Sequence, residues 1–118
     1  MAARPILALA AALLSAPVQA EPFTRIADED AFRAQATDRQ LWLGENHVTI
    51  HADGTMTGHV MGKQIVAQWT WQDGYWCRQI DGDYNSGDCQ LWETDGTQFR
   101  VTRDRGEGRA FIYTLVQE

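Results

Sequence analysis

The sequence predicts an all-β domain: a small antiparallel up-and-down barrel, or strongly bent sheet, of about eight strands with one short N-terminal helix and one disulfide. Three observations lead to this prediction. Asp-Gly pairs recur between short alternating runs, which is the strongest short-range signal for a β-hairpin. The turns and the two cysteines place the large apolar side chains on one sheet face. A meander with one apolar face curls up, because closure removes its edge strands.

Residues 1–20 have the three parts of a secretory signal peptide. Arg4 supplies a positive start, residues 5–14 form an apolar stretch, and Val18-Gln19-Ala20 ends in small residues typical of a cleavage site. The apolar stretch is about half the length needed to cross a bilayer, so no transmembrane segment is expected. We therefore predict cleavage after Ala20, a periplasmic or secreted location, and a single domain over residues 21–118.

Residues 26–37 have the pattern of one short helix. Asp28 is its expected N-cap, two acidic residues occupy the first turn, and Phe32 points inward. From Arg39 onward the chain consists of short alternating segments separated by glycine-containing turns, of which Gly62-Lys63 is one. The predicted strands lie near 41–43, 46–51, 55–60, 64–72, 75–80, 88–93, 97–103 and 109–116.

Two cysteines, Cys77 and Cys89, follow the signal peptide. An exported protein normally joins such a pair in a disulfide, and the spacing fits neither a CxxC motif nor a short zinc knuckle. The predicted bridge is structural and contributes about 3 kcal/mol by loop-closure entropy. Two-residue turns at Asp73-Gly74 and Asp95-Gly96, together with this bridge, fix three consecutive strand pairings.

The same register, extended by a three-residue loop at 52–54 and a five-residue loop at 104–108, gathers the apolar side chains on one face. Its members are Val48, Ile50, Met56, Val60, Ile65, Ala67, Trp69, Trp71, Trp76, Ile80, Trp92, Phe99, Val101, Phe111, Tyr113 and Leu115. The helix is expected either to plug one open end of the barrel or to pack outside it.

Four tryptophans of that face and one charge pair form the candidate site. The register places Arg78 opposite Asp88, close to the tryptophans. One interpretation is structural: tryptophans fill the core, and Arg78 stacks on one of them while it pairs with Asp88. The other is a ligand pocket, which typically has aromatic walls and a few convergent polar groups. Small barrels are usually filled by their own side chains, which favours the first. The candidate ligand-binding residues are Trp69, Trp71, Trp76, Arg78, Asp88 and Trp92.

The sequence offers little for other chemistries. His47 faces His59 across a hairpin without an obvious third metal ligand. Residues 81–88 faintly resemble a calcium loop, but the glycine falls one place late and no helices flank it. Ser86 is the only serine after the signal peptide, and no nucleotide-binding glycine motif occurs. We therefore predict no catalytic residue, no metal and no cofactor. A net charge of −6 also argues against nucleic acid as a partner.

The run WTWQDGYWCRQI…GDCQLWETDGTQFRVTRDRGEG resembles a family of short, uncharacterised exported proteins of alphaproteobacteria. The family pattern is a DG-x-x-x-G hairpin, then W-x-W-x-D-G-Y-[WF]-C-R, a second cysteine and a closing T-x-D-R-G-x-G. Some members are labelled dihydrodipicolinate reductase, which this sequence contradicts, because it has neither a dinucleotide fingerprint nor βαβ alternation. The matching positions here are Asp53, Gly54, Gly58, Trp69, Trp71, Gly74, Cys77, Arg78, Cys89, Arg105 and Gly106.

Two functions of different classes follow from these patterns. The first is a non-enzymatic periplasmic binding or accessory protein whose tryptophan face and Arg78 bind an unknown small molecule or protein. The alternative is an inhibitor of a secreted or periplasmic enzyme, such as a lysozyme or protease, that inserts a hairpin loop such as 81–87. An enzyme that uses Asp88 or Asp104 with Arg78 is a third possibility without further support in the sequence.

Overall fold

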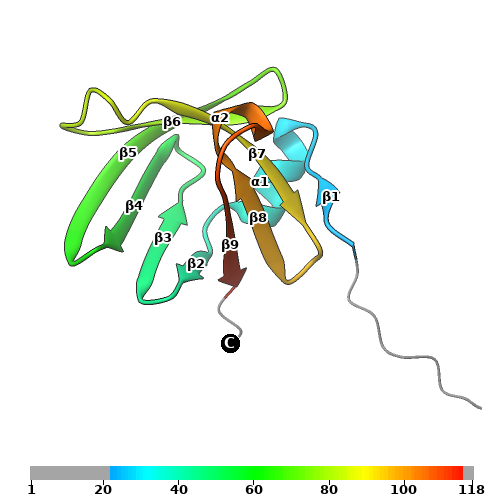
Figure 1. Ribbon diagram of the computed structural model, residues 1–118, viewed down its shortest axis with the longest axis horizontal. Helices are drawn as coiled ribbons and strands as arrows, with labels where there is room; N and C mark the ends of the chain where they lie inside the picture. The colour runs from blue at the N-terminus through cyan, green and yellow to red at the C-terminus, as the bar shows by residue number, and fades with distance from the viewer. Residues whose placement is uncertain (1–21, 116–118) are drawn as a thin grey trace, which may run out of the picture.

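The computed structural model describes residues 22–115, which form a closed eight-stranded antiparallel barrel with one extra strand and two helices (Figure 1). Each strand from β2 to β9 pairs with the next, and β9 pairs with β2 to close the ring. The predicted all-β barrel is therefore confirmed. The elements are β1 (Thr24–Arg25), α1 (Glu29–Ala36), β2 (Gln40–Leu43), β3 (Asn46–Ile50), β4 (Thr55–Val60), β5 (Lys63–Gln72), β6 (Tyr75–Ile80), β7 (Asp88–Thr94), β8 (Gln98–Thr102), α2 (Arg103–Gly106) and β9 (Ala110–Leu115).

The predicted signal peptide and its cleavage point lie outside the described residues. Within residues 22–115, no helix combines the length and the apolar character needed to span a membrane. The extra strand β1 was not predicted. It has only two residues, and it pairs with Thr94 and Glu93 at the outer edge of β7.

The strand register agrees with the sequence prediction at most turns. Cys77 lies opposite Cys89 and the two form a disulfide. The five-residue loop before β9 places Val101 opposite Phe111. The predicted apolar face is the interior of the barrel. Its buried apolar core consists of Ile26, Phe32, Ala36, Leu41, Val48, Ile50, Met56, Ala67, Trp69, Trp76, Trp92, Phe99, Val101 and Leu115.

Two predicted turns are displaced by one residue. The β7–β8 turn is centred on Gly96 and Thr97, because Asp95 Oδ1 accepts hydrogen bonds from the backbone N–H groups of Thr97 (2.9 Å) and Gln98 (2.8 Å). The β4–β5 turn is likewise centred on Met61-Gly62, since Val60 pairs with Lys63. Moving a two-residue turn by one place shifts the strand partners by two, so the predicted faces are preserved.

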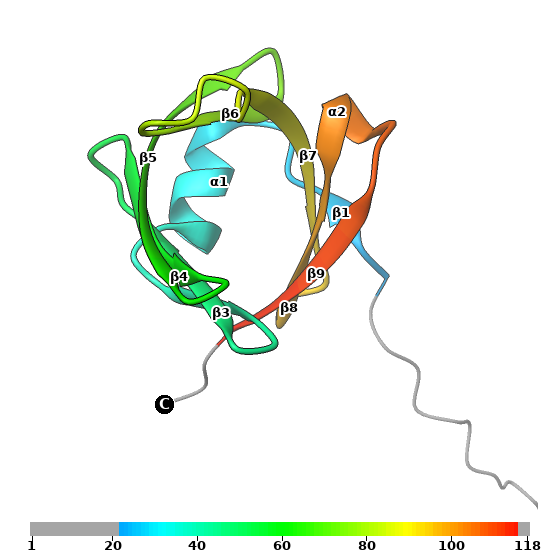
Figure 2. The same cartoon turned by 60° about the vertical axis from the view of Figure 1, so that its left-hand side comes forward.

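Helix α1 closes one end of the barrel. Asp28 caps it by accepting a hydrogen bond from the Ala31 N–H (2.8 Å), as predicted. Phe32, which is 0% exposed, projects from the helix into the interior. Its ring centroid lies between 5.1 and 6.3 Å from those of Trp69, Trp71, Trp76 and Trp92. In the view along the barrel, α1 lies inside the ring of strands (Figure 2). The helix is therefore a plug, one of the two predicted placements.

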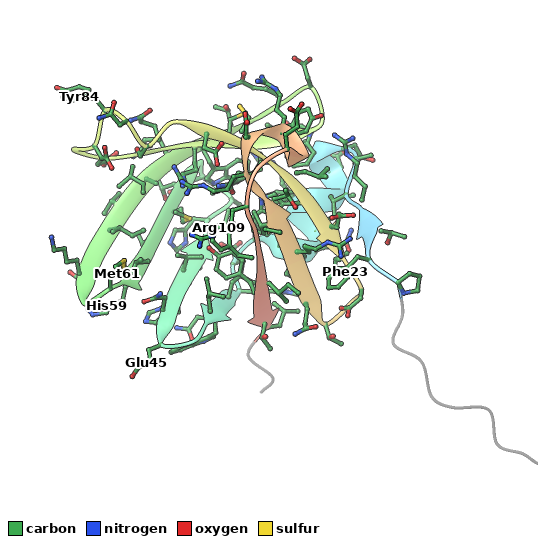
Figure 3. The ribbon with its side chains drawn as sticks, viewed as in Figure 1. Phe23, Glu45, His59, Met61, Tyr84 and Arg109 are labelled. Atoms are coloured by element: carbon green, nitrogen blue, oxygen red, sulfur yellow. A yellow bond between two sulfur atoms is a disulfide. The ribbon has the colours of Figure 1, made fainter. Side chains whose placement is uncertain are left out.

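The opposite end of the barrel is a mouth formed by four connections. Successive turns of an up-and-down barrel alternate between its two ends. The connections at 51–54, 73–74 and 95–97 share the end of α1, where Arg33 of the helix donates to the Ala52 carbonyl (2.6 Å). The connections at 44–45, 61–62, 81–87 and 103–109 therefore surround the other opening. Figure 3 shows Glu45, Met61 and Tyr84 on three of these connections.

Candidate functional site

The barrel interior is not completely filled. Between the helix plug and the mouth lies a cavity of about 410 Å³, within the usual range for small-molecule pockets. Inward-facing residues of seven strands and of the mouth connections line it. They are Leu43, Val48, Ile50, Met56, Val60, Met61, Trp76, Arg78, Gln90, Trp92, Val101, Arg103, Arg109, Phe111 and Tyr113.

Two tryptophans form the deep, aromatic part of the cavity. Trp76 is 2% exposed and Trp92 is 1% exposed, and their rings meet edge to face with centroids 5.5 Å apart. Tyr113 stacks against Trp92, with a centroid distance of 6.3 Å. Within residues 22–115, three buried indole N–H groups have no hydrogen-bond partner: those of Trp76, Trp92 and, outside the cavity, Trp42. Buried donors are almost always paired, so these three are unusual.

Polar side chains gather at the mouth side of the cavity. Arg78 donates a hydrogen bond through Nη1 to the Ser86 carbonyl, which directs its stem along β6. Burial lowers the pKa of Arg78, and the nearby positive charge of Arg103 lowers it further. Burial also raises the pKa of Tyr113, against an opposing effect of the two arginines, so its hydroxyl stays protonated at neutral pH and can donate.

The turn α2 positions Arg103 beside the cavity. Asp104 and Arg105 adopt left-handed conformations, with φ of 54° and 52°, which cost roughly 1 kcal/mol or more per non-glycine residue. Asp88 holds this turn: its carboxylate accepts hydrogen bonds from the Asp104 N–H (3.0 Å) and from Arg103 Nε (3.3 Å). Gly106 follows with φ of 90°, and a Cβ there would lie 3.1 Å from Leu91 Cδ2. The strained turn therefore has a specific anchor in Asp88.

The structure separates the predicted site residues into three groups. Trp76, Arg78 and Trp92 line the cavity. Trp69 lies under the helix, where its Nε1 donates to the carbonyls of His51 (3.0 Å) and Thr55 (3.1 Å), and Trp71 packs on Phe32. These two tryptophans are structural. Asp88 belongs to neither group and acts as the anchor of α2.

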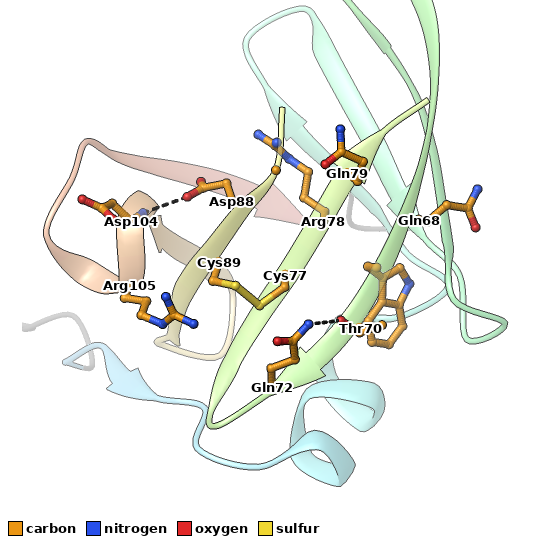
Figure 4. A pocket seen from close by; sticks show the side chains of 12 residues that line it. Gln68, Thr70, Gln72, Cys77, Arg78, Gln79, Asp88, Cys89, Asp104 and Arg105 are labelled. Carbon is orange, nitrogen blue, oxygen red and sulfur yellow. Dashed lines mark hydrogen bonds between the residues drawn. A yellow bond between two sulfur atoms is a disulfide. The ribbon is translucent and has the colours of Figure 1, made fainter. Parts of the chain in front are cut away.

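The predicted contacts of Arg78 are wrong, although its strand position opposite Asp88 is confirmed. No ion pair among residues 22–115 includes Arg78, and its guanidinium stacks on no aromatic ring of this range. Asp88 instead turns toward Asp104, as Figure 4 shows, and pairs with Arg103. Arg103 therefore forms the ion pair with Asp88 that the strand register predicted for Arg78.

A second hollow, of about 560 Å³, lies on the outer face above the disulfide (Figure 4). Outward polar side chains such as Gln68, Thr70 and Gln72 form much of it, and Gln72 Nε2 donates to Thr70 Oγ1 (2.8 Å). The predicted site residues Trp69, Arg78 and Asp88 also border this hollow. Trp69 is the one aromatic residue among the described residues that line it, whereas four aromatic residues line the interior cavity. We therefore take the interior cavity as the candidate site.

The two patterns for which a metal site was considered, the histidine pair and the 81–88 loop, can be placed as well. His47 and His59 stack with ring centroids 6.2 Å apart, and Trp42 lies against His47 at 4.5 Å. In the part of the chain that the structure describes, no three His, Cys, Asp or Glu side chains converge as a metal site. In the 81–87 loop, Ser86 is buried and its hydroxyl accepts from the Ile80 N–H (2.7 Å) and donates to the Asp83 carbonyl (2.7 Å).

The cavity residues that the sequence analysis did not assign to the site include the polar residues Arg103, Arg109 and Tyr113. The alternation of inward and outward side chains along a strand could have identified them. Arg103 continues the inward series of Phe99 and Val101, and Arg109 precedes Phe111 in the same way. The predicted apolar face was extended only through apolar residues, so the two arginines at its ends were left out.

Asp88 gives the domain a predictable acid sensitivity. Burial alone would raise the pKa of Asp88, but hydrogen bonds from Gln90, the Asp104 N–H and Arg103 outweigh burial and lower it. A carboxylate whose pKa is lower in the folded state stabilises the fold at neutral pH, and this contribution decreases as pH falls below about 4 and through the lower, folded pKa. Asp88→Asn should lower the urea midpoint at pH 7, and its difference from the wild-type midpoint should shrink as the pH is lowered further below about 4. A difference in midpoint that does not change with pH would contradict this assignment.

Comparison of the chain with protein-family models, with curated protein sequences and with solved structures finds no match. The resemblance to short exported alphaproteobacterial proteins therefore stays a prediction. The function has to be argued from the cavity itself.

Proposed function

We propose that this protein is an exported, non-enzymatic binding protein that holds a small molecule inside its barrel. One observation supports it most directly: a cavity of about 410 Å³ that combines the aromatic residues Trp76 and Trp92 with polar side chains near the mouth. A barrel built only for stability gains from filling such a space, because each missing methylene contact costs free energy. The export part rests on the predicted signal peptide and on the disulfide, which is typical of oxidising compartments.

The composition of the cavity favours a ligand with a largely apolar body. Val48, Ile50, Met56 and Val101 provide aliphatic walls, while the aromatic rings offer flat surfaces. Methionine adapts to different shapes, and aromatic rings contribute large contact areas. The polar groups are confined to the tryptophan donors and the mouth. This arrangement fits an amphipathic molecule better than a sugar or nucleotide, which would need polar partners around most of its surface.

The test uses N-phenyl-1-naphthylamine, an uncharged apolar dye, with the disulfide-intact protein expressed from the complete sequence. We expect dye emission to rise on binding and tryptophan emission to fall, because Trp76 and Trp92 line the cavity. Val60→Trp should fill the mouth side of the cavity and weaken dye affinity at least tenfold. Val66→Trp, which makes the same change on the exposed outer face of β5, should leave affinity within twofold. Equal affinity of both variants, or no dye binding at all, would overturn the proposal.

A second candidate function is inhibition of a secreted enzyme through the 81–87 loop. Tyr84 at its tip is 98% exposed, while the buried Ser86 braces the loop from inside. A rigid loop that presents one exposed tyrosine is suited to insertion into a cleft, where such anchors dominate binding. If the protein is such an inhibitor, we expect it to reduce the activity of a lysozyme or a protease. Tyr84→Ala should then abolish this inhibition. Inhibition that survives Tyr84→Ala would exclude the loop as the contact.

A further inference from the structure

The distribution of charge in the cavity is opposite to that of the chain. The protein has a net charge of −6, yet among the described residues three arginines and no carboxylate line the cavity, and Asp88 pairs with one of the three, Arg103. Arg78 and Arg103 extend from neighbouring parts of the wall, and Arg109 follows from the β8–β9 loop. A local excess of guanidinium groups on an acidic protein attracts anions to that position.

The two inner arginines retain free donors. A guanidinium has five N–H groups in a planar fork. Among the described residues, Arg78 uses Nη1 for the Ser86 carbonyl and Arg103 uses Nε for Asp88. The remaining N–H groups suit a carboxylate or phosphate, which guanidinium groups bind through paired, charge-assisted hydrogen bonds. Tyr113 and Gln90 line the same part of the cavity.

The positions of these arginines are structurally determined. Arg78 follows Cys77, so the disulfide holds the β6 backbone beside it. Arg103 is oriented by Asp88 within a turn that contains two left-handed non-glycine residues. Strained backbone that is held by a specific partner is typical of binding sites, where it places a group before the ligand arrives.

We propose that the ligand is an amphipath with a single anionic group, which Arg78 and Arg103 bind at the mouth while the apolar body lies against Trp76 and Trp92. This inference rests on the proposed function and specifies its ligand class. The anion pairs with Arg78, which like Arg109 has no ion pair with a carboxylate in residues 22–115, and with the N–H groups of Arg103 that Asp88 does not use. A carboxylate and a phosphate monoester share this chemistry.

The experiment compares two dyes with the same aromatic body. N-phenyl-1-naphthylamine is neutral, and 1-anilinonaphthalene-8-sulfonate adds one anionic group. We expect the wild-type protein to bind the sulfonate about tenfold more tightly, as expected for hydrogen bonds to charged groups. Arg78→Gln and Arg103→Gln should each remove most of this preference, measured as the ratio of the two dye affinities in the same variant.

Arg39→Gln is the matched control, because it removes the same charge from an exposed position at the plugged end of the barrel. Retained binding of the neutral dye shows that each variant still folds. If both dyes bind the wild type equally, or if the arginine variants keep the preference, the anion inference fails while the binding function stands. If neither dye binds, the binding function itself fails.

Displacement of the sulfonate dye then distinguishes the sources of the anion. Decanoate, decyl phosphate and decanol have the same chain length and differ in the head group. Stronger displacement by either anion than by decanol supports the inference, and the better of the two identifies a carboxylate or a phosphate as the preferred group. Equal displacement by decanol overturns it.

Discussion

Phe32→Ala should destabilise the domain by about 3–5 kcal/mol, the cost of deleting a fully buried aromatic side chain. Phe32 is the side chain through which α1 reaches the barrel interior, and its ring packs against those of four tryptophans. Helix α1 has only eight residues and is too short to be stable alone, so its order depends on this contact. Because folded domains have about 5–15 kcal/mol of stability in total, the variant should be marginal.

Urea unfolding followed by far-UV circular dichroism and tryptophan emission measures this effect. Ala34→Gln, on the exposed side of the same helix, is the control and should change stability by less than about 0.5 kcal/mol. Phe32→Leu should lie between the two, because it keeps an apolar group in the plug. In the folded fraction of Phe32→Ala, tryptophan emission should shift to the red as water reaches Trp69 and Trp71. An unchanged midpoint would mean that the barrel does not need its plug.

The barrel could be predicted because its determinants are local. Asp-Gly turns fix short registers, and the Cys77–Cys89 pair connects two hairpins, so a consistent apolar face emerges from neighbouring segments alone. The turn at Asp95 is displaced by one residue, but this moves the strand partners by two residues, so the same side chains remain on the apolar face. The N-cap at Asp28 and the inward position of Phe32 follow from equally local rules.

The site was harder to predict because side chains from several strands and from α2 form it. Arg78 and Arg103 are 25 positions apart in the sequence, and the pairings of β6 with β7 and of β7 with β8 bring their surroundings together. Sequence alternation puts both side chains inside, but it does not reveal which of them Asp88 binds. The strained turn of α2 decides that question, and left-handed conformations of Asp104 and Arg105 have no sequence signal. Strand β1 was missed for a related reason, since two residues give no alternation.

Removal of the disulfide by Cys77→Ser with Cys89→Ser should cost about 3 kcal/mol, as expected for a closed loop of this length. The position of the bridge suggests where that loss acts. Strands β6 and β7 are joined by only three residue pairs, whereas β5 and β6 share six. The bridge therefore reinforces a short ladder in the barrel wall, and that ladder includes Arg78 and Asp88.

Hydrogen exchange can test this localisation together with global stability. We expect the double variant to unfold at a lower urea concentration than the wild type. Its amide hydrogens should exchange fastest in β6 and β7, because no covalent bond then limits the separation of these two strands. The wild-type protein after reduction should behave in the same way. Equal acceleration of exchange in all strands would mean that the bridge acts only on the unfolded chain, as the loop-entropy account assumes. Selective acceleration in β6 and β7 would show instead that the disulfide keeps the wall beside Arg78 closed, and dye affinity should then fall in parallel.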